Sequence, residues 1–77
     1  MRFFKPQPHT YRTKAAERLS KLASGDVLNW AYAYLSGVWR ELEGYDNGGH
    51  CDLDEVERGL QCLLGAVDAL RRRDKRR

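Results

Sequence analysis

The sequence predicts an all-α fold, in which a short N-terminal helix precedes a long antiparallel helical hairpin. Three observations point to this class. Strand-forming residues are scarce, because the 77 residues include four valines, two threonines and no isoleucine. Two segments carry apolar residues at alternating spacings of three and four, as one face of an amphipathic helix does. Glycines and acidic residues fall between these segments, where helices end and begin.

The N-terminal segment, residues 1–12, contains both prolines and has no helical period, so we expect an extended arm. A first helix is expected over 13–23. Gly25 then stands where a C-terminal helix cap belongs, since glycine adopts a positive φ without penalty. Asp26 follows as an N-cap acceptor for the next helix. The chain is therefore expected to turn sharply at this joint.

A second helix is expected over 27–43, ending at Gly44. Its apolar seam consists of Leu28, Ala31, Leu35, Val38 and Leu42. Three aromatic residues flank and widen this seam: Trp30, Tyr34 and Trp39. Tyr32 and Ala33 extend the apolar character almost around the helix. A helix with so many aromatic side chains is expected to be covered on more than one side.

A third helix is expected over 53–72, with Asp52 and Glu55 forming a capping box at its start. Its seam consists of Leu53, Val56, Leu60, Leu63, Val67 and Leu70. Beside the seam runs a row of small residues: Gly59, Cys62, Ala66 and Ala69. Such a row allows a close helix approach or admits bulky side chains, and we expect Trp30, Tyr34 or Trp39 to pack over it. The prediction is one helical domain over 13–72 and a basic tail over 73–77.

The predicted lengths indicate a further covering element. At 1.5 Å per residue the second and third helices are about 25 and 30 Å long, and the first only about 15 Å. The first helix therefore cannot cover the whole hairpin. Either the arm with Phe3, Phe4 and Tyr11 covers the remainder, or a second molecule does. We predict a symmetric homodimer with a helical-bundle core.

Charge is distributed in blocks. Residues 1–22 carry six bases and one acid, residues 23–70 two bases and nine acids, and residues 71–77 six bases and one acid, which gives +3 overall. Six cations near the C-terminus form a candidate nucleic-acid-binding segment: Arg71, Arg72, Arg73, Lys75, Arg76 and Arg77. The alternative is a solvated tail that complements the helix dipole.

Nothing in the sequence indicates catalysis, a cofactor or a small-molecule substrate. Zinc sites have paired short spacings of cysteine and histidine, and this chain has none. A disulfide between Cys51 and Cys62 is not expected, because the helix from Leu53 to Cys62 spans about 13 Å, more than the separation of bridged Cα atoms. No apolar run approaches the roughly 20 residues of a membrane span, and no export signal is evident, so we expect a cytoplasmic protein.

These observations favour a small protein-interaction module, an adaptor, inhibitor or accessory regulator that presents an apolar and aromatic helical surface. The candidate protein-binding residues are Phe3, Phe4, Trp30, Tyr32, Tyr34 and Trp39. The alternative is a nucleic-acid-binding accessory protein of low sequence specificity, which would use the basic segments at both ends of the chain.

Overall fold

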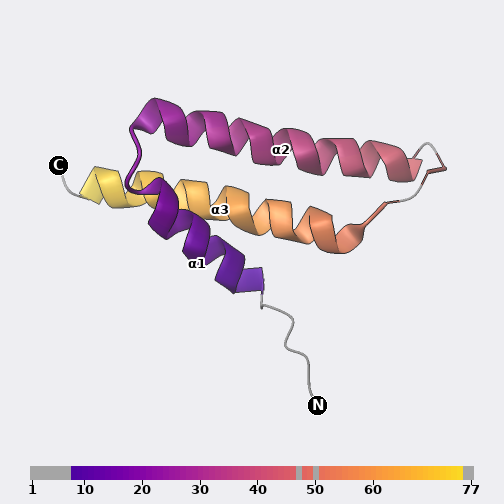
Figure 1. Ribbon diagram of the computed structural model, residues 1–77, viewed down its shortest axis with the longest axis horizontal. Coiled ribbons are helices and arrows are strands. Elements are labelled where there is room, and N and C mark those ends of the chain that lie inside the picture. Colours follow the sequence, from indigo (N-terminus) through magenta and orange to yellow (C-terminus); the bar gives the residue numbers. More distant parts are fainter. Residues whose placement is uncertain (1–7, 47, 50, 76–77) are drawn as a thin grey trace, which may run out of the picture.

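The computed structural model describes residues 8–46, 48–49 and 51–75. Nearly all of them lie in three α-helices: α1 (Pro8–Leu19), α2 (Ser24–Asp46) and α3 (Leu53–Lys75). These residues contain no strand, so the predicted all-α class is confirmed. In Figure 1, α2 and α3 lie side by side and run in opposite directions, and α1 lies across α3.

The first helix begins at Pro8, inside the segment that was expected to be an extended arm. Proline suits the first turn of a helix, because the amide hydrogen that it lacks would have no helical acceptor there and its φ is already helical. The predicted arm is therefore wrong from residue 8 onward. Phe3 and Phe4, which we expected either to cover the core or to bind a partner, lie outside the described residues.

The joint between α1 and α2 also differs from the prediction. α1 ends at Leu19 rather than at residue 23, and α2 begins at Ser24. The Ala23 carbonyl accepts hydrogen bonds from the amides of Asp26 and Val27, at 3.0 and 3.1 Å. Gly25 thus lies in the first turn of α2 without a positive φ, and it does not cap α1 as predicted.

The end of α2 is capped by a different glycine from the one expected. α2 continues past Gly44 to Asp46. Gly48 has a φ of 78°, the left-handed conformation that glycine adopts without a steric penalty. Its amide donates to the Tyr45 carbonyl at 3.2 Å, and the next amide, that of Gly49, donates to the Gly44 carbonyl at 2.8 Å. These bonds satisfy carbonyls that the end of the helix leaves open.

The start of α3 agrees with the sequence in its N-cap, but the predicted capping box does not form, because Glu55 pairs with Arg58 and not with the Asp52 amide. The Asp52 carboxylate accepts hydrogen bonds from the amides of Asp54 and Glu55, at 3.0 and 3.3 Å, and so acts as the predicted N-cap. The Asp52 amide in turn donates to the Glu41 carboxylate at 3.1 Å, which joins the last turns of α2 to the start of α3. α3 continues to Lys75, so the predicted tail is helical over 73–75. Arg76 and Arg77 lie outside the described residues.

The core is small and rich in alanine. Its central cluster consists of Ala15, Leu19, Val27, Ala66 and Ala69. Leu19 and Val27 are the largest side chains that are fully buried among the described residues. The cluster lies where all three helices meet, and α1 supplies two of its five members.

Two glycines of α3 let the other helices approach closely. A Cβ atom at Gly65 would lie 2.5 Å from the Arg12 carbonyl oxygen and 2.6 Å from the Ala15 Cβ of α1. A Cβ atom at Gly59 would lie 2.6 Å from a methyl group of Val38 in α2. Gly59 belongs to the predicted row of small residues and allows the close helix approach that was one of the two expected roles of that row, whereas Gly65 lies outside the row. Of the aromatic residues expected over it, Tyr34 packs against the core cluster, whereas Trp39 is 62% exposed.

Candidate interaction surfaces

Most of the predicted leucine seam faces outward in the isolated chain. On α2 the predicted seam divides, because Val38 is buried against α3 whereas Leu28, Leu35 and Leu42 are exposed. On α3 the exposed residues include Leu53, Leu60 and Val67. We define the leucine face as these residues together with one neighbour on α3: Leu28, Leu35, Leu42, Leu53, Leu60, Leu64 and Val67. Each is between 38% and 60% exposed.

The α2 part of this face points away from α1. Successive residues are rotated by about 100° around the axis of α2. Leu35 therefore lies about 60° to one side of the buried Val38, and Trp30 lies about 80° to the other side. Trp30 lies next to Arg18 of α1. The side of α2 that carries Leu35 is therefore the side remote from α1.

The α3 part lies on the same side of the helix pair. Around the axis of α3, Gly59 lies about 20° from the buried Ala66 and contacts α2. Gly65 lies about 100° from Ala66 in the opposite direction and contacts α1. Leu60 and Val67 lie about 120° and 100° from Ala66 in the same direction as Gly59, and so on the far side of the α2 contact from α1. The exposed residues of α2 and α3 thus form one surface, on the side of the α2–α3 pair that α1 does not cover.

The spacing along each helix is regular. Leu28, Leu35 and Leu42 are separated by seven residues, and so are Leu53, Leu60 and Val67. A seven-residue apolar repeat keeps a seam facing a partner helix in coiled coils and four-helix bundles. The exposed face therefore has the residue types and the period of a helix–helix interface.

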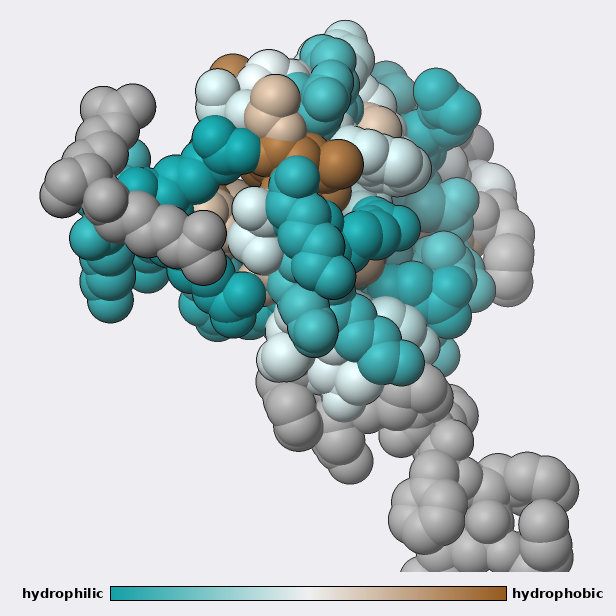
Figure 2. Space-filling view, turned by 60° about the vertical axis from the view of Figure 1, so that its left-hand side comes forward, coloured by the Kyte–Doolittle hydropathy of each residue, from teal (hydrophilic) through white to brown (hydrophobic). Residues whose placement is uncertain are grey.

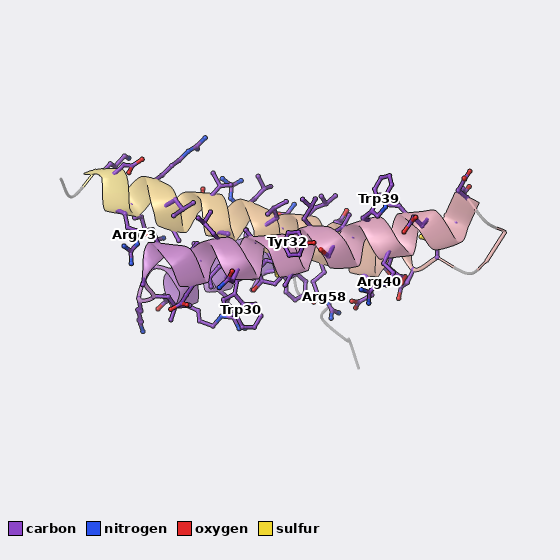
Figure 3. The ribbon with its side chains drawn as sticks, turned by 90° about the horizontal axis from the view of Figure 1, so that it is seen from above. Trp30, Tyr32, Trp39, Arg40, Arg58 and Arg73 are labelled. Atoms are coloured by element: carbon purple, nitrogen blue, oxygen red, sulfur yellow. The ribbon has the colours of Figure 1, made fainter. Side chains whose placement is uncertain are left out.

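Two of the predicted aromatic residues border the leucine face. Tyr32 and Trp39 are 72% and 62% exposed. Both lie about 100–120° from Val38 on the same side as Leu35. Figure 3 shows Trp39 and Trp30 pointing to opposite sides of α2. Tyr32 and Trp39 thus widen the open surface, and Trp30 does not.

Trp30 and Tyr34 take part in a contact within the chain. The Arg18 guanidinium lies 4.8 Å from the centre of the Trp30 ring and donates a hydrogen bond to the Tyr34 hydroxyl. The centres of the Trp30 and Tyr34 rings are 5.8 Å apart. Burial raises the pKa of Tyr34, and the Arg18 charge opposes this shift. This cluster attaches α1 to α2. Of the predicted aromatic residues that the structure describes, Tyr32 and Trp39 are therefore left without an internal role of this kind.

Neither Arg18 nor the related contact at Tyr11 was identified from the sequence. The Arg58 guanidinium of α3 lies 5.0 Å from the centre of the Tyr11 ring of α1. Cation–π pairs join residues that are distant in sequence, and no local pattern marks them. These contacts show that polar and aromatic side chains, as well as buried alanines, hold α1 against α2 and α3.

The basic last turns of α3 lie beside the end of α1 at one end of the molecule. Arg73 of α3 donates a hydrogen bond to the Leu22 carbonyl, which places the end of α3 beside the connection between α1 and α2. Arg71, Arg72 and Lys75 are exposed at this end. Figure 2, which brings this end forward, shows hydrophilic residues over much of the surface around a smaller hydrophobic patch. We call this region the basic end.

The opposite end carries negative charge. The connection between α2 and α3 and the turns beside it contain most of the acids: Glu41, Glu43, Asp46, Asp52, Asp54, Glu55 and Glu57. Arg40 and Arg58 are the bases of the same region, and Arg58 pairs with Glu55 at 2.9 Å. We call this region the acidic end. The α2–α3 pair therefore carries opposite charge at its two ends.

The two cysteines are free thiols. Burial, with smaller contributions from Glu41 and Asp52, raises the pKa of Cys51, and burial raises the pKa of Cys62. Both shifts disfavour the reactive thiolate.

Within residues 8–46, 48–49 and 51–75, no three histidine, cysteine or acidic side chains come together as a metal site would require. None of the helices in the described part of the chain is long and apolar enough to span a membrane.

Comparison with known proteins gives no match, whether with protein-family models, with curated proteins or with solved structures. The chemistry of the leucine face and of the basic end is therefore the basis for a functional proposal.

Proposed function

We propose that this chain is a small non-enzymatic protein-interaction module, an adaptor, inhibitor or accessory regulator that binds through its leucine face. The observation that carries the proposal is the seven-residue repeat of exposed leucines on both α2 and α3. Exposed apolar residues in isolation are ordinary, but a contiguous apolar surface marks an interaction site. The free thiols suit a reducing compartment such as the cytoplasm.

The physical basis of binding is removal of the leucine side chains from water, which contributes about 25 cal/mol per Å² of apolar surface. Tyr32 and Trp39 add large side chains of the kind that dominate binding energy at interfaces. In this proposal the α2–α3 hairpin acts as a rigid platform, and its occupant is either a second copy of the chain, as in the predicted homodimer, or a helical segment of another protein.

The proposal is tested by placing a charge on the leucine face and the same charge elsewhere on α2. Leu35→Glu introduces a carboxylate into the face, and Ala33→Glu introduces one on an exposed position away from α3. Both variants should retain their helical circular dichroism. The immobilised parent should capture a partner, either its own copy or another protein, and Leu35→Glu should lose that capture while Ala33→Glu keeps it. Equal capture by both variants would contradict the proposal.

A second candidate function is nucleic-acid binding through the basic end. The observation in its favour is that Arg71, Arg72 and Lys75 are exposed near the connection between α1 and α2. Exposed cations of this kind neutralise phosphates and release counterions, so that affinity falls as salt rises. The acids on the same stretch of α3 are Asp68, with which Arg12 already pairs, and the exposed Asp74.

Retention on a DNA column across a salt gradient tests this candidate. A variant with glutamine at Arg71, Arg72 and Lys75 should elute at lower salt than the parent. Arg40→Gln removes an exposed cation at the acidic end and serves as the control. Elution of the parent at low salt, unchanged in the triple variant, would exclude this function.

A further inference from the structure

We infer that the leucine face binds a second copy of this chain, docked so that the α2–α3 connections of the two copies lie at opposite ends of a four-helix bundle. This inference rests on the proposed function, because it names the occupant of the same surface. Three observations on the described residues support it: the charge of the two ends, the position of the leucines, and the size of the face.

If the helices of the two copies pack nearly parallel or antiparallel, as in a four-helix bundle, two-fold symmetry leaves two arrangements. In a closed dimer the same surface of each copy meets its counterpart across a two-fold axis. An axis parallel to the helices would place both α2–α3 connections at the same end and α2 of one copy over α3 of the other. An axis perpendicular to the helices, in the plane of the leucine face, would place the connections at opposite ends and α2 over α2.

Charge selects the second arrangement. With the connections at the same end, Glu43 and Asp46 of one copy would lie near the acids at the start of α3 of the other, and the two basic ends would also meet. With the connections at opposite ends, the exposed cations Arg71, Arg72 and Lys75 of each copy lie over the acidic end of the other. Each 23-residue helix is about 34 Å long, several times the Debye length of about 8 Å, so the two ends of one copy do not neutralise each other.

In this arrangement the apolar repeat on each helix can lie against the same repeat of the other copy. Leu35 is the middle member of the repeat on α2, and Leu60 is the middle member of the repeat on α3. Because Val38 lies against Gly59, position 35 is level with about position 62, and Leu60 is therefore only about 3 Å along the axis from Leu35. One two-fold axis can thus pass close to both middle residues.

The partner of each leucine follows from that axis. Leu35 meets Leu35 of the other copy, and Leu60 meets Leu60. On either side of the axis, Leu28 meets Leu42 and Leu53 meets Val67. Each repeat is thus self-complementary when one copy is reversed, and every apolar position of the repeat has an apolar counterpart.

The size of the face suits a stable dimer. Two helices, each about 34 Å long and about 10 Å across, present about 700 Å², and specific interfaces bury about 800 Å² per partner. α1 lies on the other side of the α2–α3 pair and leaves this approach open (Figure 3). The Arg18–Trp30 cluster remains on the outside of the dimer.

Sedimentation and cysteine cross-linking test the inference on the full chain. Sedimentation should give twice the chain mass of 8.9 kDa, and Leu35→Glu should return the monomer mass while Ala33→Glu leaves the dimer intact. In a background with Cys51→Ser and Cys62→Ala, Leu35→Cys should form a disulfide-linked dimer on mild oxidation. Leu28→Cys should not, since the two copies of residue 28 would lie about 21 Å apart, but a mixture of Leu28→Cys and Leu42→Cys chains should cross-link.

Several results would overturn the inference. Cross-linking between Leu35→Cys and Leu60→Cys chains, in place of Leu35→Cys with itself, would indicate that the connections lie at the same end. A monomer mass for the parent at every concentration would exclude the second copy as occupant. If Leu35→Glu then still abolished capture of another protein, the proposed function would stand and only this inference would fail; if no partner were captured, both would fail.

Discussion

Arg12 of α1 and Asp68 of α3 form a two-pronged ion pair, in which Nε lies 2.6 Å from Oδ2 and Nη2 lies 2.9 Å from Oδ1. The Arg12 guanidinium holds the pKa of Asp68 below its usual value, chiefly through the hydrogen bond. The pair lies next to the contact between Gly65 and the Arg12 carbonyl. It therefore fixes the position of α1 where the backbones of α1 and α3 come closest.

Asp68→Asn should destabilise the protein at pH 7 but not in strong acid. A carboxyl whose folded pKa is depressed stabilises the fold above its unfolded pKa, about 3.9, and loses that contribution as the pH falls through the lower folded pKa. The difference in thermal midpoint between parent and variant should thus be greatest near neutral pH and disappear once the pH has fallen below the folded pKa of Asp68. The effect should be modest, because the two side chains are 40% and 25% exposed.

Circular-dichroism melts at several pH values check this. Asp74→Asn, which changes an exposed carboxyl near the end of the same helix, is the matched control. A destabilisation by Asp68→Asn that is the same at every pH would mean that the charge of Asp68 is not what holds α1.

Gly65→Ala should lower the free energy of unfolding by about 1–3 kcal/mol, the usual cost of forcing an extra methyl group into a packed interface. The added Cβ would lie 2.5 Å from a backbone carbonyl oxygen, which cannot move without shifting α1. Gly37→Ala is the control, since its Cβ meets no atom within 4 Å, and it should stabilise α2 by about 0.5–1 kcal/mol. Urea titrations measure both, and equal effects would contradict the close approach of α1 to α3.

Leu19→Ala and Leu28→Ala should differ in how their effects depend on protein concentration. Leu19 is fully buried within one chain, so its truncation should cost about 2–5 kcal/mol at every concentration. Leu28 is 58% exposed, so its truncation should matter only where copies associate, because dimerisation links the thermal midpoint to concentration. Melts over a hundredfold concentration range separate the two, and a concentration-independent loss in Leu28→Ala would contradict the assignment of Leu28 to an interface.

Asp52→Ala should cost about 1 kcal/mol through loss of the N-cap of α3, whereas Asp52→Asn should cost much less, because the asparagine side chain also accepts the two amide hydrogen bonds. Amide hydrogen exchange at the first turn of α3 reports the loss locally. Equal exchange in the two variants would mean that the charge of Asp52, rather than its position as a cap, stabilises the helix.

The helical class and the start of α3 could be predicted because they depend on local signals. Asp52 caps α3 through atoms two and three residues away, and such contacts are visible in the sequence. The end of α2 could not be placed because Gly44 and Gly48 are both plausible caps, and only the backbone shows that Gly48 has the positive φ. The start of α1 differs from the prediction because proline, which interrupts the interior of a helix, fits its first turn.

The candidate surface was predicted in composition but not in direction. Spacings of three and four identify an apolar side of α2, but Val38 and Leu35 are only about 60° apart on it. Which of them faces α3 depends on Gly59, a residue that is distant in sequence. The row of small residues on α3 therefore determines which apolar residues are left outside, and no feature within α2 does so.

Gly59 and Val38 also constrain each other as the sequence changes. Because a methyl group at position 59 would occupy space already filled by a Val38 methyl, alanine at 59 should become acceptable only together with a smaller residue at 38. The double change Gly59→Ala with Val38→Ala should thus be less harmful than the sum of its parts. Pairs of chains that differ at one of these two positions are expected to differ at the other.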